Sequence, residues 1–205
     1  MIPVTASDDQ LNQYVENITL AWETLTSDQE QQGRLWYPVA HQIASVIGDG
    51  DVRTGAGLLA VLSANKRWEL NVSLAHDAAS GNVHGHTGTT LEKVRKILDG
   101  TDPVLVLPAG LKTGHFFRAI LDPSDPDPVV IDRHAHDIAA GEIYGNKERG
   151  LSNLTRYATL AHAYRTAARD ISVIPGVLQA GTWVRHTQEL AGTGTRGPRE
   201  RREKG

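Results

Sequence analysis

The stretch from Leu107 to Ile138 limits most strongly how this chain can fold. It contains a turn at Pro108–Gly110, a helix from Lys112 to about Leu121, a proline-rich loop, and a second helix that starts near Asp132. Proline and glycine are the strongest interruptions of regular structure, so they separate these segments. We therefore expect a turn–helix–loop–helix unit that places Lys112 and Asp132 each at the start of a helix.

Apolar residues recur at helical spacing through most of the remaining chain. The apolar runs Val104–Leu107 and Val129–Ile131 are too short to indicate a sheet, so the sequence predicts an all-α protein. Thr54 is a candidate N-cap for one helix, and Thr89 or Thr90 for another. The other expected helices are Asp8–Leu25, Trp36–Ile47, Gly55–Asn65, Trp68–Ala79, Leu91–Leu98, a helix from Arg149 or Ser152 to Ala168, and Gly176–Leu190.

The chain of 205 residues is long enough for one domain built from two small lobes around a shared groove, which we place at residues 1–190. No apolar run approaches the ~20 residues that a membrane span needs, and the N-terminus lacks the pattern of a secretory signal. The absence of cysteine excludes disulfides, thiolate catalysis and cysteine-bound zinc or iron–sulfur clusters. We expect a cytoplasmic protein with no membrane partner.

The charge is unevenly distributed along the chain. The formal net charge is −3, yet the last ten residues, RGPRERREKG, hold four arginines and one lysine against two glutamates. We expect residues 191–205 to form a disordered basic tail. Such tails commonly add salt-sensitive attraction to phosphates, although a solubilising end is an equal alternative.

The central stretch resembles the helix-hairpin-helix DNA glycosylase superfamily, the group of endonuclease III and 8-oxoguanine glycosylase. The matching residues are Leu107-Pro108, Lys112-Thr113, the Pro123–Pro128 loop and Ile131–His134, with an upstream match at Leu58–Asn65 followed by Asn71. The resemblance covers roughly residues 55–140. It implies two helical lobes around a central groove, double-stranded DNA as the partner, and no cofactor. It makes no prediction of oligomeric state.

Lys112 is the first candidate catalytic residue that the resemblance implies. A lysine amine can displace a base from C1′ of a nucleotide and leave a Schiff base with the opened sugar. The amine must be neutral to attack, which requires partial desolvation or nearby cations. An exposed lysine at a helix start, or one that binds a phosphate, is the alternative.

Asp132 is the second candidate catalytic residue. It follows an apolar triplet, so its side chain should emerge from the core at a helix N-terminus. In the resembled family the matching aspartate assists the nucleophile and stabilises positive charge on the sugar. Aspartate is also a good helix N-cap, and that role alone would explain it.

The remaining candidates are DNA contacts. The hairpin of Pro108, Ala109, Gly110 and Leu111, with Thr113, would offer backbone N–H groups to a phosphate. This hairpin has one glycine where the family usually has two, and it is one residue shorter. The resemblance also implies DNA contacts for residues of two other segments, namely Asn65, Arg67, Arg133 and His134.

Asn65 has two interpretations. It matches the amide residue that fills the gap left by a flipped-out base in the resembled family. It would serve equally well as a helix C-cap.

Nine histidines raise the question of a metal site. His134 and His136 would point to different sides of a helix and cannot easily share one ion. His84 and His86 lie in a loop and remain possible ligands, but we expect no metal. His134 fits a groove residue or a core histidine better.

Three functions follow as hypotheses. The first is a DNA N-glycosylase with lyase action through Lys112. The second is an enzyme of the same fold that modifies DNA bases, as some phage-encoded relatives of the superfamily do. The third is a non-catalytic DNA-binding module, for which changes at Lys112 and Asp132 would affect affinity alone.

Overall fold

A computed structural model of the chain describes residues 5–192. These residues form helices joined by turns and loops, without a strand, which confirms the predicted all-α fold. The helices are α1 (Asp8–Glu23), α2 (Ser27–Ile47), α3 (Val52–Leu62), α4 (Trp68–Ala79), α5 (Gly88–Leu98), α6 (Pro103–Val106), α7 (Lys112–Leu121), α8 (Arg133–Ala140), α9 (Asn146–Arg149), α10 (Leu154–Asp170) and α11 (Pro175–Gly192).

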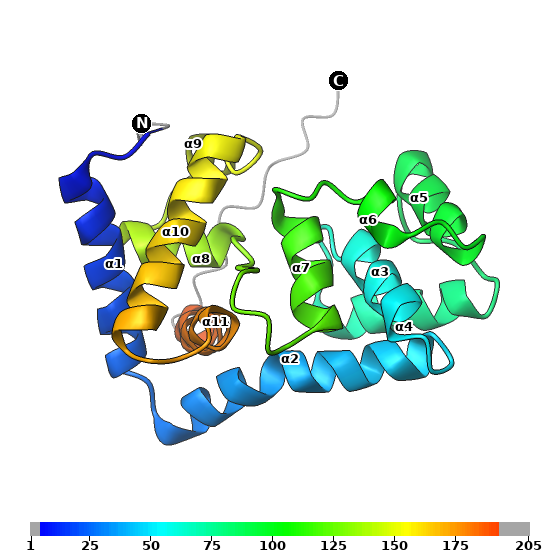
Figure 1. The fold of residues 1–205 in the computed structure, drawn as a ribbon, viewed down its shortest axis with the longest axis horizontal. Helices are drawn as coiled ribbons and strands as arrows, with labels where there is room; N and C mark the ends of the chain where they lie inside the picture. The colour runs from blue at the N-terminus through cyan, green and yellow to red at the C-terminus, as the bar shows by residue number, and fades with distance from the viewer. Residues whose placement is uncertain (1–4, 193–205) are drawn as a thin grey trace.

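The helices gather into two groups, each with its own hydrophobic core. Figure 1 shows α3–α7 on one side and α1 with α8–α11 on the other. The first core centres on the apolar helix α3, in which Leu58, Leu59 and Leu62 are fully buried. The second core centres on α10, with Tyr157 and Tyr164 fully buried. The loop from α7 to α8 joins the two groups (Figure 1).

Helix α2 runs beneath both groups and connects them (Figure 1). Near its C-terminal end, Ala40 and Ala44 belong to the first core. Near its N-terminal end, Gly33 lies against α11 so closely that a Cβ atom there would stand 2.5 Å from Cα of Gly181. The two backbones therefore touch at this crossing, and α2 and α11 fix the relative position of the lobes.

The start of α2 differs from the predicted start at Trp36. Thr26 caps the helix, its hydroxyl accepting from the N–H of Gln29 while the Gln29 side chain accepts from the N–H of Thr26. The first turns are largely exposed, so they carry no apolar stripe from which periodicity could detect a helix. The capping box was the available signal.

Other predicted boundaries shift as well. The N-cap residue of α3 is Asp51 rather than Thr54, and that of α5 is Thr87 rather than Thr89 or Thr90. The long helix α10 begins at Leu154, with Asn153 as its N-cap, rather than at Arg149 or Ser152. Helices α6 and α9 were not predicted, because four residues are too few to show a helical period. Helix α11 includes Ala191 and Gly192, which were predicted to belong to the tail.

The rest of the predicted tail, residues 193–205, lies outside the described residues. Within residues 5–192, no helix combines the length and the apolar character needed to cross a membrane.

The contact at Gly33 yields a prediction about stability. Gly33→Ala forces α2 away from α11, because the added methyl meets backbone rather than a flexible side chain. We expect it to lower the free energy of unfolding by about 1–3 kcal/mol, as overpacked cores do. Gly88→Ala is the matched control: it also lies in a helix, but nothing stands within 4 Å of the added methyl. Urea denaturation of both variants measures the difference, and equal stability would contradict the close packing.

Candidate functional site

Asp132 is held where the loop from α7 enters α8. The preceding segment Val129–Ile131 is buried and belongs to no helix. The hydroxyl of Tyr157 accepts from the N–H of Ile131 and donates to the carbonyl of Val129, both at 2.9 Å. Asp132 then caps α8, with Oδ1 accepting from the N–H groups of His134 and Ala135 at 2.9 Å each. The half-buried carboxylate is thus anchored to rigid elements.

The second oxygen of Asp132 contacts helix α11. The indole N–H of Trp183 donates to Oδ2 of Asp132 at 3.1 Å. The Trp183 ring also lies edge-on to the ring of His134, at 6.2 Å between centroids. Three N–H donors therefore contact one carboxylate.

His134 is neutral at physiological pH. Burial lowers the pKa of His134 to about 4, and this effect exceeds the opposing attraction of Asp132. Its Nε2 atom lies 3.0 Å from the guanidinium Nε of Arg133, which donates to it. The ring of His186 is a further neighbour of His134. Burial lowers the pKa of His186 as well. Arg133 itself is exposed.

Aromatic rings from both lobes meet beside Trp183. Trp36 of α2 lies 6.3 Å from Trp183, 5.0 Å from Trp68 and 5.9 Å from Phe116, between ring centroids. We call Trp36, Trp68, Phe116 and Trp183 the aromatic cluster. Its three tryptophans are half-buried, whereas Phe116 is buried. The cluster links α4 and α7 of one lobe to the carboxylate at the start of α8.

Asn65 and Arg67 lie in the turn before Trp68, and both are exposed. Asn65 adopts a left-handed conformation (φ 57°). The C-cap of α3 is Ser63, so the interpretation of Asn65 as that C-cap is wrong. Asn71, farther along in α4, is a core residue, whose amide donates to the carbonyl of Leu59 at 3.0 Å.

The predicted hairpin precedes α7. The N–H of Leu111 donates to the carbonyl of Pro108 at 3.2 Å, which closes the turn over Ala109 and Gly110. A Cβ atom on Gly114 would lie 2.4 Å from the same carbonyl, so glycine is required where α7 packs against the hairpin. No side chain of the described residues caps the N-terminal end of α7.

Lys112 is the first residue of α7, and like Thr113 it is half-buried. Its amine forms no hydrogen bond or ion pair with any described residue, including Asp132. The structure thus brings Asp132, Arg133 and His134 together with Trp183, while Lys112 begins α7 of the other lobe (Figure 1). The hairpin before α7 contacts the lobe of Asp132, because Leu111 packs against the second core and Gly110 lies beside Leu154 of α10.

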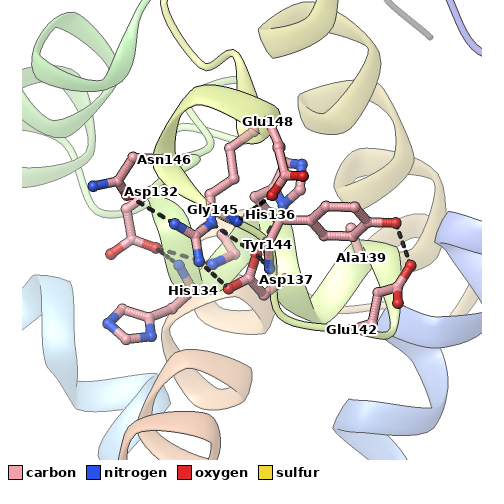
Figure 2. Close-up of polar contacts among 12 residues, drawn as sticks. Asp132, His134, His136, Asp137, Ala139, Glu142, Tyr144, Gly145, Asn146 and Glu148 are labelled. Carbon is pink, nitrogen blue, oxygen red and sulfur yellow. Dashed lines mark hydrogen bonds and ion pairs between the residues drawn. The ribbon is translucent and has the colours of Figure 1, made fainter. Parts of the chain in front are cut away.

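A buried ion pair lies farther along α8. Arg149 donates to both oxygens of Asp137, at 2.8 and 2.6 Å, and His136 Nδ1 lies 3.0 Å from Oδ1. Burial raises the pKa of Asp137, but hydrogen bonds from His136 and Arg149 outweigh it, so the pKa lies below its ordinary value. Figure 2 shows Asp137 between Tyr144 on one side and His134 on the other. This ion pair connects the segment around α9 to α8, and Asp137 is also the partner of the His136 ring.

The loop histidines contact different partners. His84 Nε2 lies 2.9 Å from a carboxylate oxygen of Asp77, and His86 Nε2 lies 2.9 Å from the carbonyl of Leu62. Their rings are therefore engaged with separate groups.

A cavity of about 200 Å³ lies between α1, α11 and the segment after α8. It contains none of the predicted site residues. His186 lines it and also contacts His134, so the cavity adjoins the back of the Asp132 site. Its lining residues are Ala21, Asp137, Ile138, Gly141, Glu142, Ile143, Thr182, Arg185, His186 and Glu189.

Sequence reasoning missed Trp183, which contacts Asp132, and also Trp36 and His186, which contact Trp183 and His134. A tryptophan at helical spacing usually belongs to a core, so the spacing gave no sign of a polar role. The available signal was the residue type, because the N–H of a tryptophan usually finds a hydrogen-bond partner when it is buried.

The chain belongs to the Family of unknown function (DUF7178), whose family model matches residues 1–190. A search of curated proteins and a search of solved structures each gave no match.

His115 supports a prediction about pH. Its Nδ1 atom accepts from the N–H of Val129 at 3.2 Å, and its ring stacks on Tyr157. Burial, reinforced by Arg165 and Arg118, lowers the pKa of His115 to about 4 from 6.5. Between these values the unfolded chain binds a proton that the folded protein does not, so stability falls as the pH falls from about 6.5 to about 4.

The test is the pH dependence of the free energy of unfolding. His115→Gln should flatten that dependence by up to about 3 kcal/mol over this interval. His162→Gln, at an exposed position on α10, is the control and should keep the wild-type slope. An unchanged slope in His115→Gln would show that the pKa of His115 is the same in the folded and the unfolded chain, which contradicts the prediction.

Proposed function

We propose that this protein acts on a base in DNA: it flips a nucleotide out of the duplex and cleaves its N-glycosidic bond, with lyase action through Lys112. The observation that carries the proposal is a half-buried carboxylate, Asp132, fixed at the N-terminus of α8 beside aromatic rings from both lobes. This combination supplies an anion and flat apolar surfaces in one place.

The aromatic cluster supports binding of an extruded base. A base that leaves the duplex loses its stacking, and enzymes of this kind restore it on aromatic side chains. Trp36, Trp68 and Trp183 retain exposed surface, and Trp183 contacts the carboxylate directly. A ring stacked there would hold its sugar near Asp132.

Asp132 would stabilise the positive charge that develops on the sugar as the bond to the base breaks. Oδ1 accepts two hydrogen bonds, whereas Oδ2 accepts one from Trp183 and keeps a lone pair for a ligand. A preorganised charge of this kind acts without reorganisation during the reaction.

Lys112 would act as the nucleophile. Its amine has no partner among the described residues and stands at the start of α7, after the hairpin. The amine lone pair forms a bond to C1′, the electrons of the C1′–N bond leave with the base, and the base takes up a proton. Loss of a proton from the amine and opening of the sugar give the Schiff base, which water later hydrolyses.

Borohydride trapping tests the role of Lys112. Wild-type protein mixed with a duplex that carries an abasic site should form a covalent adduct after reduction, and Lys112→Gln should lose it. Lys147→Gln makes the same change at an exposed lysine of α9 and should trap normally. An adduct that persists in Lys112→Gln would show that another amine is the nucleophile. If neither the wild-type protein nor the variants form an adduct, lyase action is excluded.

Base excision itself is tested with Asp132→Asn, which retains an N-cap for α8. Over a panel of duplexes with damaged or modified bases, we expect excision to fall by about 100-fold or more, with DNA affinity retained. If the wild-type protein excises no base, and both Asp132→Asn and Lys112→Gln bind DNA more weakly than the wild-type protein does, the chain is a binding module. A new nucleoside in treated DNA, detected by mass spectrometry, would instead indicate base modification.

A further inference from the structure

We propose that Trp183 is a positioning residue, which orients the Asp132 carboxylate through its indole N–H. This inference rests on the proposed function for its role in a reaction, but the hydrogen bond itself is independent of that function. Trp183 lies on α11, far from Asp132 in sequence, and its N–H is 3.1 Å from Oδ2.

The two oxygens of Asp132 have different tasks. Oδ1 accepts the N–H groups of His134 and Ala135 and thereby caps α8. These two hydrogen bonds fix the position of Oδ1. The tilt of the carboxylate plane then depends on the hydrogen-bond partner of Oδ2. The partner is Trp183, so the indole determines where the free lone pair of Oδ2 points.

Trp183 is itself held firmly. Its ring lies edge-on to Trp36 on one side, at 69° between ring planes, and to His134 on another, at 89°. Its neighbours Thr182 and Val184 are buried in the lobe, which fixes α11 at this point. Because Trp36 belongs to α2, the orientation of the carboxylate depends on how the lobes meet.

The first test reads the hydrogen bond by NMR, without any substrate. The four tryptophans give four indole N–H signals, and Trp183→Phe identifies that of Trp183. Asp132→Ser keeps an N-cap for α8 but is too short to reach the indole. In Asp132→Ser we expect the Trp183 signal to shift and its N–H to exchange faster with water, whereas Asp132→Asn keeps an acceptor and changes less. An unchanged signal in a folded Asp132→Ser protein overturns the contact.

The second test reads the consequence for activity. Trp183→Phe should lower kcat by about 10- to 100-fold, the cost of a hydrogen bond to a charged group, with little change in KM. Trp22→Phe is the control: it makes the same change at a tryptophan of α1 that packs against the second core and donates no hydrogen bond to Asp132, so it should keep the wild-type kcat.

The two tests separate the two proposals. If the wild-type protein excises no base, the proposed function fails, while the indole signal still decides the contact. If the protein is active and Trp183→Phe matches it in kcat and in KM, then Trp183 does not position the carboxylate.

Discussion

The backbone contact between α2 and α11 is the constraint on which the arrangement of the molecule depends. Gly33 and Gly181 allow the helices to approach until no side chain separates them. One turn along α2, Trp36 reaches Trp183, and the hydroxyl of Tyr37 donates to the Gln179 side chain at 2.8 Å. A larger residue at the crossing would move α11, and Trp183 would move with it. The geometry around Asp132 is therefore set by how two lobes meet.

A second set of contacts fixes the carboxylate from the other direction. The loop that leaves α7 returns to the core as a buried segment, whose backbone groups form hydrogen bonds with Tyr157 and His115. Farther along, the buried Arg149–Asp137 pair ties the following segment to α8. Asp132 lies between these anchors, so its side chain emerges from a rigid frame. A site that stabilises charge benefits from such a frame, because the dipoles are in place before the reaction.

The proposed chemistry uses both lobes. One contributes Asp132 and Trp183, and the other contributes Lys112 and Trp68. A substrate that enters between the lobes can contact side chains from both of them, and an extruded nucleotide would be such a substrate. The family match over residues 1–190 includes all of these residues, so the hypothesis applies to a family whose function is unknown.

Several local features could be predicted from the sequence because short-range chemistry decides them. Apolar spacing predicted the all-α fold, and proline and glycine placed Lys112 at the start of α7 and Asp132 at the N-cap of α8. The start of α2 was missed because an exposed turn carries no apolar stripe. The short helices α6 and α9 were missed because a single turn has no period.

The sequence by itself determined the positions of the longer helices, apart from the start of α2, and that a carboxylate would cap the helix after the proline-rich loop. Only the tertiary structure decided that Trp183, 51 positions away, donates to that carboxylate, and that three tryptophans from different helices share one cluster. The physical reason is range. Capping and periodicity depend on residues that are near one another in the sequence. The contacts around Trp183 depend instead on the angle and the distance at which helices cross, and a local sequence pattern does not specify either.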